Sequence, residues 1–411
     1  MHLVRANPEE HHVRLSLRGG VRCVTQLPVW TIARVTLWAI VGAALSGGAP
    51  SSLQAQARTG RVEGSVRAAQ SDAPLPYAVV KISALSLERF TDASGRFTLG
   101  GLPAGTHDVL VRRIGFTPWR GTIRVAADST TQLAVRLEQL PQRLATVAVR
   151  EMARCPNPGP PDPVLQQEVF SLVAQLRENA DRYRLLADQY PFAYSQLRGL
   201  GELRDTVFVL QRVDTSIVQS GTRVRYRPGK LVTRTTSKTR GEEFTMAIPT
   251  LIELTDEAFI RVHCFGYGGT VQAGTETWVR VNMRAADKLN APDVHGSFFL
   301  DSATSQLRRM DLDMSRPDLL PPQLQRVDAV HVVTSFRDIA AGLSVIESVC
   351  AVNQLRRPPG ADEPPAPAEM QQLLAYRFAT PPPDVVGVRA FMAPRWVPGA
   401  RLSRDVVWCE P

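Results

Sequence analysis

The stretch TDASGRFTLGGLPAGTHDVLVRRIGFTP, residues 91–118, decides the fold of the first part of the chain. Its segments GRFTL (95–99) and HDVLVRRIGF (107–116) alternate polar and apolar residues, which is the period of a half-buried β-strand. The sequence DASG at 92–95 predicts a tight turn, because Gly95 can adopt positive φ. The sequence PAG at 103–105 interrupts the next connection. These residues therefore predict consecutive short strands joined by tight turns.

The same alternation continues on both sides of this stretch. It appears at Val62, Gly64 and Val66, and again in YAVVKISAL (77–85), ERFTD (88–92), GTIRV (121–125) and TQLAVRL (131–137). Short strands separated by turn residues at intervals of about 8–12 positions are typical of an antiparallel β-sandwich. Residues 60–138 thus predict a sandwich of seven strands.

Three spaced motifs within residues 59–138 resemble the signature of the carboxypeptidase regulatory-like domain, a small prealbumin-like β-sandwich. They are a T-D-x-x-G-x-F hairpin from Thr91, an L-P-x-G-x-H turn from Leu102 and an R-x-I-G-F strand from Arg112. The family is named for a domain that accompanies metallocarboxypeptidases, and it also stands at the front of envelope proteins, including TonB-dependent receptors. The resemblance implies export and a contact role, but not peptidase chemistry, because a fold alone does not fix a function.

A Pro-rich joint, CPNPGPP at 155–161, precedes a different pattern. Between Pro163 and Gln189 apolar residues recur mostly every three or four positions, which predicts a long amphipathic helix with Asp162 as its N-cap. After Tyr190 strand-like segments follow one another, with one short helical turn expected near 252–258. The second part therefore predicts a large antiparallel sheet or half-barrel with one long N-terminal helix, and the fold class is mainly β.

This second part resembles a bacterial domain that often follows the regulatory-like module in exported proteins and has no assigned activity. The resembling elements are Cys155, the helix, AFIRVHCF (258–265), PDVHGSFFLDSATSQLRRMDL (292–312) and a closing strand pair, so they cover about residues 155–355. The usual helix motif is replaced by VFSLVAQLRENA (169–180), and the sequence after Arg357 extends beyond the resemblance.

The N-terminus has the three parts of a secretory signal. The uncharged segment VTLWAIVGAALS (35–46) follows Arg22 and Arg34, and AQA at 55–57 forms an A-x-A cleavage site. The segment is shorter than the roughly 20 residues that cross a bilayer, so we interpret it as a signal and not as an anchor. We expect cleavage near Ala57 and export of a mature protein that is periplasmic or associated with outer-membrane components. No Cys stands at the cleavage position, which argues against a lipid anchor.

We therefore predict a signal peptide at 1–57, a regulatory-like sandwich at 58–150, a linker at 151–162 and a β-rich domain of unknown function with a C-terminal extension at 163–411. The 411 residues are 44% hydrophobic and 21% charged, as in soluble globular proteins, which excludes a disordered chain or a multi-span membrane protein. The net charge of +9 falls to +6 without residues 1–57, and residues 58–150 hold all of this excess. Only four of the 48 basic residues are Lys. The basic residues do not belong to any known nucleic-acid-binding module, so we exclude nucleic acid as a partner.

The motifs of hydrolase chemistry are missing from the sequence. No His is followed three residues later by Glu, as a zinc carboxypeptidase requires, and no G-x-S-x-G elbow is present. We interpret Asp311 and Asp313 as solvated acids on one strand face, the Gly-rich run at 266–269 as a wide hairpin loop, and His263 as a structural residue. We predict no catalytic residue, no metal and no cofactor.

Arg112, Arg113, Trp119 and Arg120 place cations beside aromatic rings near a strand end, which makes them candidates for binding an acidic or sugar partner. In a further variant, Trp119 is a stacking platform for a glycan. The alternative, which we favour, is that Ile114 and Phe116 belong to the core and the arginines form a solvated rim. We retain the four residues as candidates.

Two functions from different classes remain. The first is a non-catalytic exported envelope protein that binds a protein, peptide or glycan through its β-rich domains. The second is a secreted hydrolase of peptides or glycans whose site the sequence does not reveal. The missing motifs favour the first.

After signal removal four cysteines remain, Cys155, Cys264, Cys350 and Cys409, and they allow three pairings. We predict Cys155–Cys264, which belongs to the part that carries the resemblance and would tie the linker to the sheet, and Cys350–Cys409, which would fix the C-terminal extension. Non-reducing peptide mapping of the exported protein should recover these two linked peptide pairs. A peptide that joins Cys264 to Cys350 would contradict the assignment.

Overall fold

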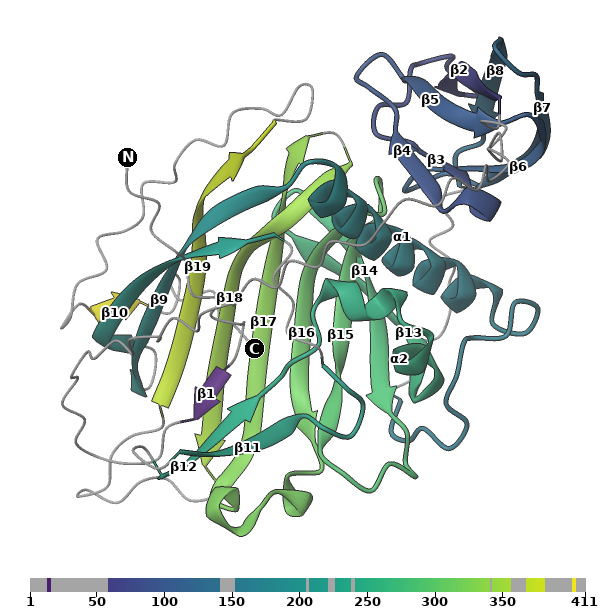
Figure 1. Cartoon of the computed structure of the whole chain (residues 1–411). Coiled ribbons are helices and arrows are strands. Elements are labelled where there is room, and N and C mark those ends of the chain that lie inside the picture. Colours follow the sequence, from purple (N-terminus) through teal and green to yellow (C-terminus); the bar gives the residue numbers. More distant parts are fainter. Residues whose placement is uncertain are drawn as a thin grey trace, which may run out of the picture.

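The computed structural model describes residues 13–15, 58–140, 152–204, 207–220, 226–237, 241–340, 342–355, 367–380 and 401–403. The protein is mainly β, as the sequence predicts, with one long helix and several sheets (Figure 1). A small sandwich lies beside helix α1 (Gln167–Gln189), and a large curved sheet lies on the other side of that helix.

The first domain is a seven-stranded sandwich. Its strands are β2 (Thr59–Ala68), β3 (Val79–Ile82), β4 (Leu87–Phe90), β5 (Arg96–Pro103), β6 (Gly105–Arg112), β7 (Trp119–Val125) and β8 (Thr130–Leu137). One sheet has the order β5-β2-β8 and the other β4-β3-β6-β7. All pairings are antiparallel except β2 with β8, which the expectation of a purely antiparallel sandwich did not include.

The turn predicted at 92–95 has the expected geometry. Gly95 has φ of +73°, and the Asp92 carboxylate accepts hydrogen bonds of 2.9 Å from the backbone N–H groups of Ser94 and Arg96. The alternating apolar residues of both sheets face each other, and Val62, Val80 and Leu99 are almost completely buried between them. Period-two patterning and turn chemistry therefore suffice to define this domain.

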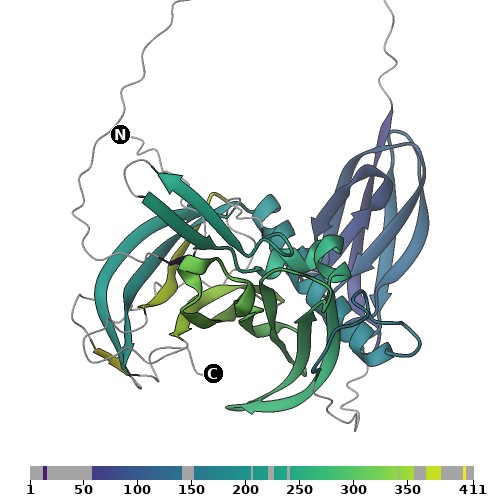
Figure 2. The same ribbon diagram turned by 90° about the horizontal axis from the view of Figure 1, so that it is seen from below.

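The second domain is built on an open ten-stranded sheet with the order β13-β14-β15-β16-β17-β18-β19-β9-β10-β20. The strands are β9 (Phe192–Arg204), β10 (Val207–Gln219), β13 (His263–Ala273), β14 (Glu276–Ala285), β15 (Asp293–Asp301), β16 (Leu307–Ser315), β17 (Val327–Ala340), β18 (Leu343–Leu355), β19 (Pro367–Phe378) and β20 (Arg401–Ser403). Seen from below, the sheet curves around α1, so it forms the expected half-barrel (Figure 2).

Strand β19 comes from the sequence that extends beyond the family resemblance. It pairs with β18 on one side and with β9 on the other, both antiparallel. The extension is therefore an integral part of the sheet, which a strand-by-strand interpretation of the sequence could not show.

Helix α1 joins the sheet to the sandwich. Asp162 accepts hydrogen bonds from the backbone N–H groups of Val164 and Leu165, but the residues that follow form a turn, and the helix begins four residues later than the predicted Pro163. Leu176 and Ala180 pack into the core on the concave face of the sheet, whereas Leu186 packs into a second cluster that includes residues of the sandwich.

The segment AFIRVHCF (258–265), which is one of the strand-like segments predicted after Tyr190, is only partly a strand. Glu257–Arg261 form a short helix, α2, which follows the turn η2 (Leu251–Thr255), and β13 begins only at His263. The Asp256 side chain caps α2 by accepting a hydrogen bond of 2.8 Å from the Ala258 N–H. Phe259 and Ile260 are both buried although they are neighbours, which a strand with one solvent face would not allow.

Two further strands, β11 (Val232–Ser237) and β12 (Gly241–Met246), form a hairpin that pairs with β1 (Val13–Leu15). Apart from β1, the predicted signal peptide lies outside the described residues, and so do the cleavage position Ala57 and the linker up to residue 151. In the described part of the chain, no helix has both the length and the apolar character needed to cross a membrane.

Replacing Leu176 by Ala should lower the free energy of unfolding by about 2–5 kcal/mol, because Leu176 is 0% exposed and its loss leaves a cavity under α1. Leu165→Ala is the matched control, since Leu165 is 86% exposed, and its effect should stay within about 0.5 kcal/mol. Urea unfolding monitored by circular dichroism measures both. Equal losses would contradict the packing of α1 against the sheet.

Candidate functional site

The strand that carries Arg112 faces α1, so this candidate binds acidic groups of the same chain. Its Nη1 donates hydrogen bonds of 2.7 Å to Glu178 and 2.8 Å to Asp181, and its Nη2 lies 3.5 Å from a carboxylate oxygen of Glu88. The Arg112 side chain is 11% exposed. Arg112 therefore binds acidic groups of its own chain, at the boundary between the two domains. It is neither a solvated rim residue nor accessible to a separate partner.

Glu88 is a second charged residue that joins the two domains at this boundary. Its carboxylate accepts a hydrogen bond of 2.6 Å from Arg184 of α1 and lies 2.8 Å from the Lys81 ammonium. Burial would raise the pKa of Glu88, but the hydrogen bonds from Lys81 and Arg184 outweigh this effect, so its pKa lies below the usual value. Glu88 is therefore ionised at neutral pH and attracts cations from both domains.

Arg182 connects three parts of the molecule through one guanidinium. Its Nη1 donates to the backbone carbonyl of Tyr77 in the sandwich, while Nε and Nη2 donate to the carbonyl of Gly342 at 2.9 and 2.6 Å. Its side chain also lies over the Phe90 ring, 5.5 Å from the ring centre. The helix, the sandwich and the turn between β17 and β18 are thereby fixed to one another.

The remaining candidates differ in their surroundings. Arg113 is packed close to Gly342, where an added Cβ would lie 2.2 Å from its Nη1, and burial lowers the pKa of Arg113 to about 10. Trp119 is partly buried against the sandwich core, and its ring lies over Gly121, so one ring face is covered by its own strand. Arg120 is exposed. The structure does not bring these residues together into one open binding surface with Arg112.

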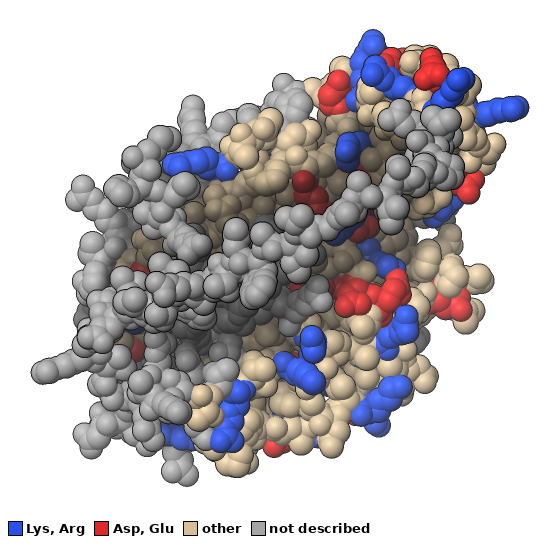
Figure 3. All heavy atoms as spheres, in the orientation of Figure 1, with Lys and Arg blue, Asp and Glu red and all other residues tan. Residues whose placement is uncertain are grey.

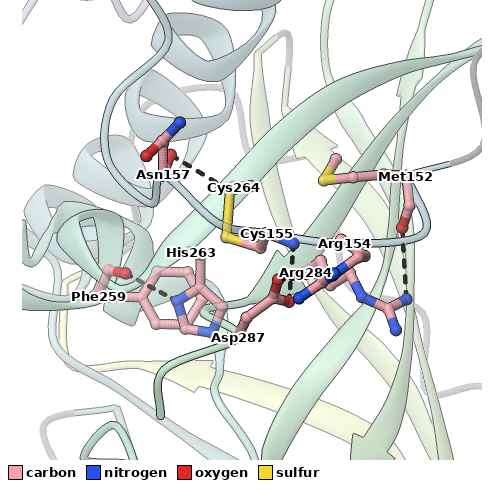
Figure 4. Close-up of a disulfide and its surroundings, with 9 residues drawn as sticks. All are labelled: Met152, Arg154, Cys155, Asn157, Phe259, His263, Cys264, Arg284 and Asp287. Atoms are coloured by element: carbon pink, nitrogen blue, oxygen red, sulfur yellow. Dashed lines mark hydrogen bonds and ion pairs between the residues drawn. A yellow bond between two sulfur atoms is a disulfide. The ribbon is translucent and has the colours of Figure 1, made fainter.

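The disulfide between Cys155 and Cys264 is present, with Cα atoms 5.6 Å apart, and it confirms the first predicted pair (Figure 4). Around it, Asp287 accepts hydrogen bonds from the Cys155 N–H at 2.9 Å and from Arg154 at 3.1 Å. The linker is thus held on the end of β13 by covalent and polar contacts together. Cys350 is also disulfide-bonded, and its predicted partner, Cys409, lies outside the described residues.

His263 has the structural surroundings that we expected. It is 0% exposed, its Nδ1 lies 2.8 Å from the Phe259 carbonyl, and its Nε2 lies 3.6 Å from the carboxylate of Asp293. Asp293 in turn accepts hydrogen bonds from the Tyr226 hydroxyl and the Gly229 N–H. Within the described residues, no group of three or more His, Cys, Asp or Glu side chains is arranged to hold a metal ion.

The convex face of the ten-stranded sheet carries an ordered set of polar and aromatic side chains, which we call the outer array. Strand pairing aligns them in three rows: Arg280, Phe299 and Arg309; Asn282, Ser297 and Asp311; His295, Asp313 and His331. The intervening residues, such as Val281, Phe298 and Leu312, are buried in the core on the opposite face. Strands β14 to β17 therefore have one face buried in the core and one face that carries the outer array.

Both acids of the outer array have a partner within it. Arg309 lies 2.5 Å from Asp311, and Asp313 lies 2.8 Å from His331 Nδ1, so the acids that we expected to be solvated are paired. Burial lowers the pKa of His295, although Asp313 opposes this effect. Arg280 donates from Nε to the Gly268 carbonyl at 2.9 Å and forms no ion pair with a described residue.

The array also explains the Gly-rich run at 266–269, which is part of β13 and not the predicted hairpin loop. The strand pairing shifts between Tyr267 and Thr270, and an added Cβ at Gly268 would lie 2.6 Å from Arg280 Nε. A side chain at position 268 would therefore displace the Arg280 and Asn282 side chains that lie over the strand.

Sequence analysis did not identify Trp278, Arg280 and Asn282 as functional candidates. The available signal was their spacing of two in ETWVRVNM, which places all three on one strand face. It could not show which strands lie beside that face. The acids of α1 that bind Arg112 were missed for a similar reason, because only the tertiary structure joins α1 to the sandwich.

Comparison with known proteins identifies the first domain. Residues 61–138 match the family model of the carboxypeptidase regulatory-like domain, which confirms the resemblance stated above. No curated protein matches the chain.

Among solved structures, the chain is similar to the minor pilin GBS52 of Streptococcus agalactiae (14% identity, TM-score 0.18), covering 23% of this chain and 48%, about half, of the pilin chain. It is also similar to a LolA superfamily protein of Nitrosomonas europaea (7% identity, TM-score 0.27, 51% of this chain and 94% of that one). A third is the major pilin subunit BcpA of Bacillus cereus (11% identity, TM-score 0.18, 76% and 95%). Likenesses this distant support no functional inference.

Glu88→Gln should destabilise the protein by about 3 kcal/mol at pH 7, because Lys81, Arg112 and Arg184 lose a largely buried counter-charge. The folded pKa of Glu88 is below its unfolded value, so this stability is present above the unfolded pKa of about 4.3 and is lost as the pH falls through the folded pKa. The difference between wild type and variant should therefore shrink below about pH 4.

Glu63→Gln is the control, because Glu63 pairs with Arg61 on the open face of the sandwich and is 40% exposed. Its effect should stay below about 1 kcal/mol. Thermal unfolding at several pH values provides the measurement. A Glu88→Gln effect that is the same at pH 7 and pH 3 would disprove the role of the ionised carboxylate.

Proposed function

We propose that the chain is a non-catalytic exported envelope protein that binds a protein, peptide or glycan partner through its β-rich domains. We further propose that the signal peptide is cleaved near Ala57 and that the mature protein is periplasmic or associated with outer-membrane components. No nucleic acid, cofactor or metal is part of this proposal.

Export is supported by the cysteines. Disulfides form and persist mainly in oxidising compartments such as the bacterial periplasm. Cys155 and Cys264 are joined, and Cys350 is oxidised as well. The regulatory-like domain at 61–138 agrees with this location, since the family also stands at the front of envelope proteins.

The observation that carries the binding role is the two-faced ten-stranded sheet. Its concave face packs on α1 and on the segment from Tyr226 to Ile260, so that face holds the core together. Its convex face carries the outer array in register.

On the face of the molecule seen in Figure 3, basic and acidic side chains are interspersed over the sandwich, so a partner of that region meets both signs of charge.

Residues 58–411, immobilised and screened against peptide and glycan arrays, should retain one class of ligand. The same protein incubated with soluble peptides and glycans, with and without zinc, should release no product, because the proposal contains no catalytic group. Accumulating product would instead establish the alternative, a secreted hydrolase. Retention of neither peptides nor glycans would refute binding of these two partner classes.

A further inference from the structure

We infer that the outer array, together with Trp278 on the same face of β14, is a binding surface for an acidic polysaccharide, in which Trp278 stacks on a sugar ring and Arg280 binds its carboxylate. This inference deepens the proposed function and rests on it. It selects the glycan among the possible partners and assigns it to the convex face of β14 to β16.

The first argument is the aromatic platform. Trp278 belongs to the same strand face as Arg280 and Asn282, and its ring lies 6.2 Å from that of Phe299, tilted by 58°. The indole N–H donates a hydrogen bond of 2.8 Å to Glu276, which orients the ring. Trp278 keeps partial exposure. A ring that is fixed at its edge and supported by a second aromatic side chain offers a preformed apolar surface to the C–H face of a sugar.

The second argument is the charge beside this platform. Arg280 lies directly opposite Phe299 in the strand pairing, one position further along the strand face than Trp278. Its Nε is used by the Gly268 carbonyl, which fixes the side chain, and among the described residues no carboxylate pairs with its guanidinium. A planar guanidinium matches the geometry of a carboxylate and binds it through two parallel hydrogen bonds.

The third argument is the state of the neighbouring acids. The charge of Asp311 is paired with Arg309 at 2.5 Å, and Asp313, one step further along β16, is hydrogen-bonded to His331 at 2.8 Å. Asn282 accepts from the Ser297 hydroxyl at 3.0 Å through its side-chain oxygen, which leaves its amide N–H groups to donate. Glu276, whose carboxylate accepts from the indole, is itself paired with Arg308 at 3.4 Å. The Arg280 guanidinium and the Asn282 amide are therefore the groups beside Trp278 that can donate to a sugar acid.

Trp119 lacks these features. Its ring lies over Gly121 and packs against the sandwich core, and the exposed Arg120 next to it in sequence points to the other strand face. Trp119 and Arg120 therefore serve as matched controls for Trp278 and Arg280.

The test is isothermal titration of residues 58–411 with oligogalacturonate, a neutral cello-oligosaccharide and oligoglutamate. Oligogalacturonate should bind, and the binding should weaken with added salt because an exposed charge pair contributes to it. Trp278→Ala and Arg280→Gln should each weaken binding by about tenfold or more, whereas Trp119→Ala and Arg120→Gln should leave it unchanged. Arg280→Lys should also weaken it, because Lys cannot bind the carboxylate through two parallel bonds.

Thermal unfolding of every variant distinguishes lost contacts from lost folding, and Trp278→Phe, which keeps an aromatic ring, should retain more binding than Trp278→Ala. Oligogalacturonate that binds wild type and array variants equally would overturn the inference and leave the proposed function standing. Stronger binding of the cello-oligosaccharide, or binding of oligoglutamate alone, would overturn the choice of an acidic glycan. If no probe binds, the inference fails; if the array screen also retains nothing, the proposed binding of peptides and glycans fails with it.

Discussion

The buried guanidinium of Arg182 is the constraint on which the two-domain arrangement depends. It satisfies the carbonyls of Tyr77 and Gly342, which belong to elements far apart in the sequence, and it stands on a helix between them. A buried cation is costly to desolvate unless its hydrogen bonds are made. Any movement of the sandwich away from α1 would break them, so the regulatory-like domain behaves as a fixed part of the molecule and not as a module on a tether.

A second constraint follows for the sheet. Because α1 and the segment around Phe259 fill its concave face, the side chains on that face are committed to the core, and variation there would cost stability. On the convex face, the side chains of the outer array make polar contacts in register, whereas Val333 and Cys350, further along the row of Asp311, are buried. The outer array, which we propose as a recognition surface, therefore lies opposite the helix.

Local patterns predicted the sandwich well, because alternation in β2 to β8 and the turn at Asp92 act over a few residues. The long helix and the half-barrel were also predicted, as was the bond between Cys155 and Cys264. The predictions that failed depended on contacts between residues that are far apart in the sequence. The apolar run at Ala258 resembles a strand until its burial on both sides is known, and Arg112 resembles a surface cation until Glu178, 66 residues away, is placed beside it. The array around Trp278 depends on which strands are neighbours, and spacing within one strand cannot supply this.

Strand β19 has a consequence for how the protein is made. It lies between β18 and β9, so the sheet consists of two unconnected halves until residues 367–378 have emerged. A chain secreted from its N-terminus would wait, with the edges of β9 and β18 unpaired, for nearly its whole length to cross the membrane. Such edges invite pairing with other chains, so for the exported chain that we propose, the interval between translocation of β18 and arrival of β19 is when a chaperone is most needed.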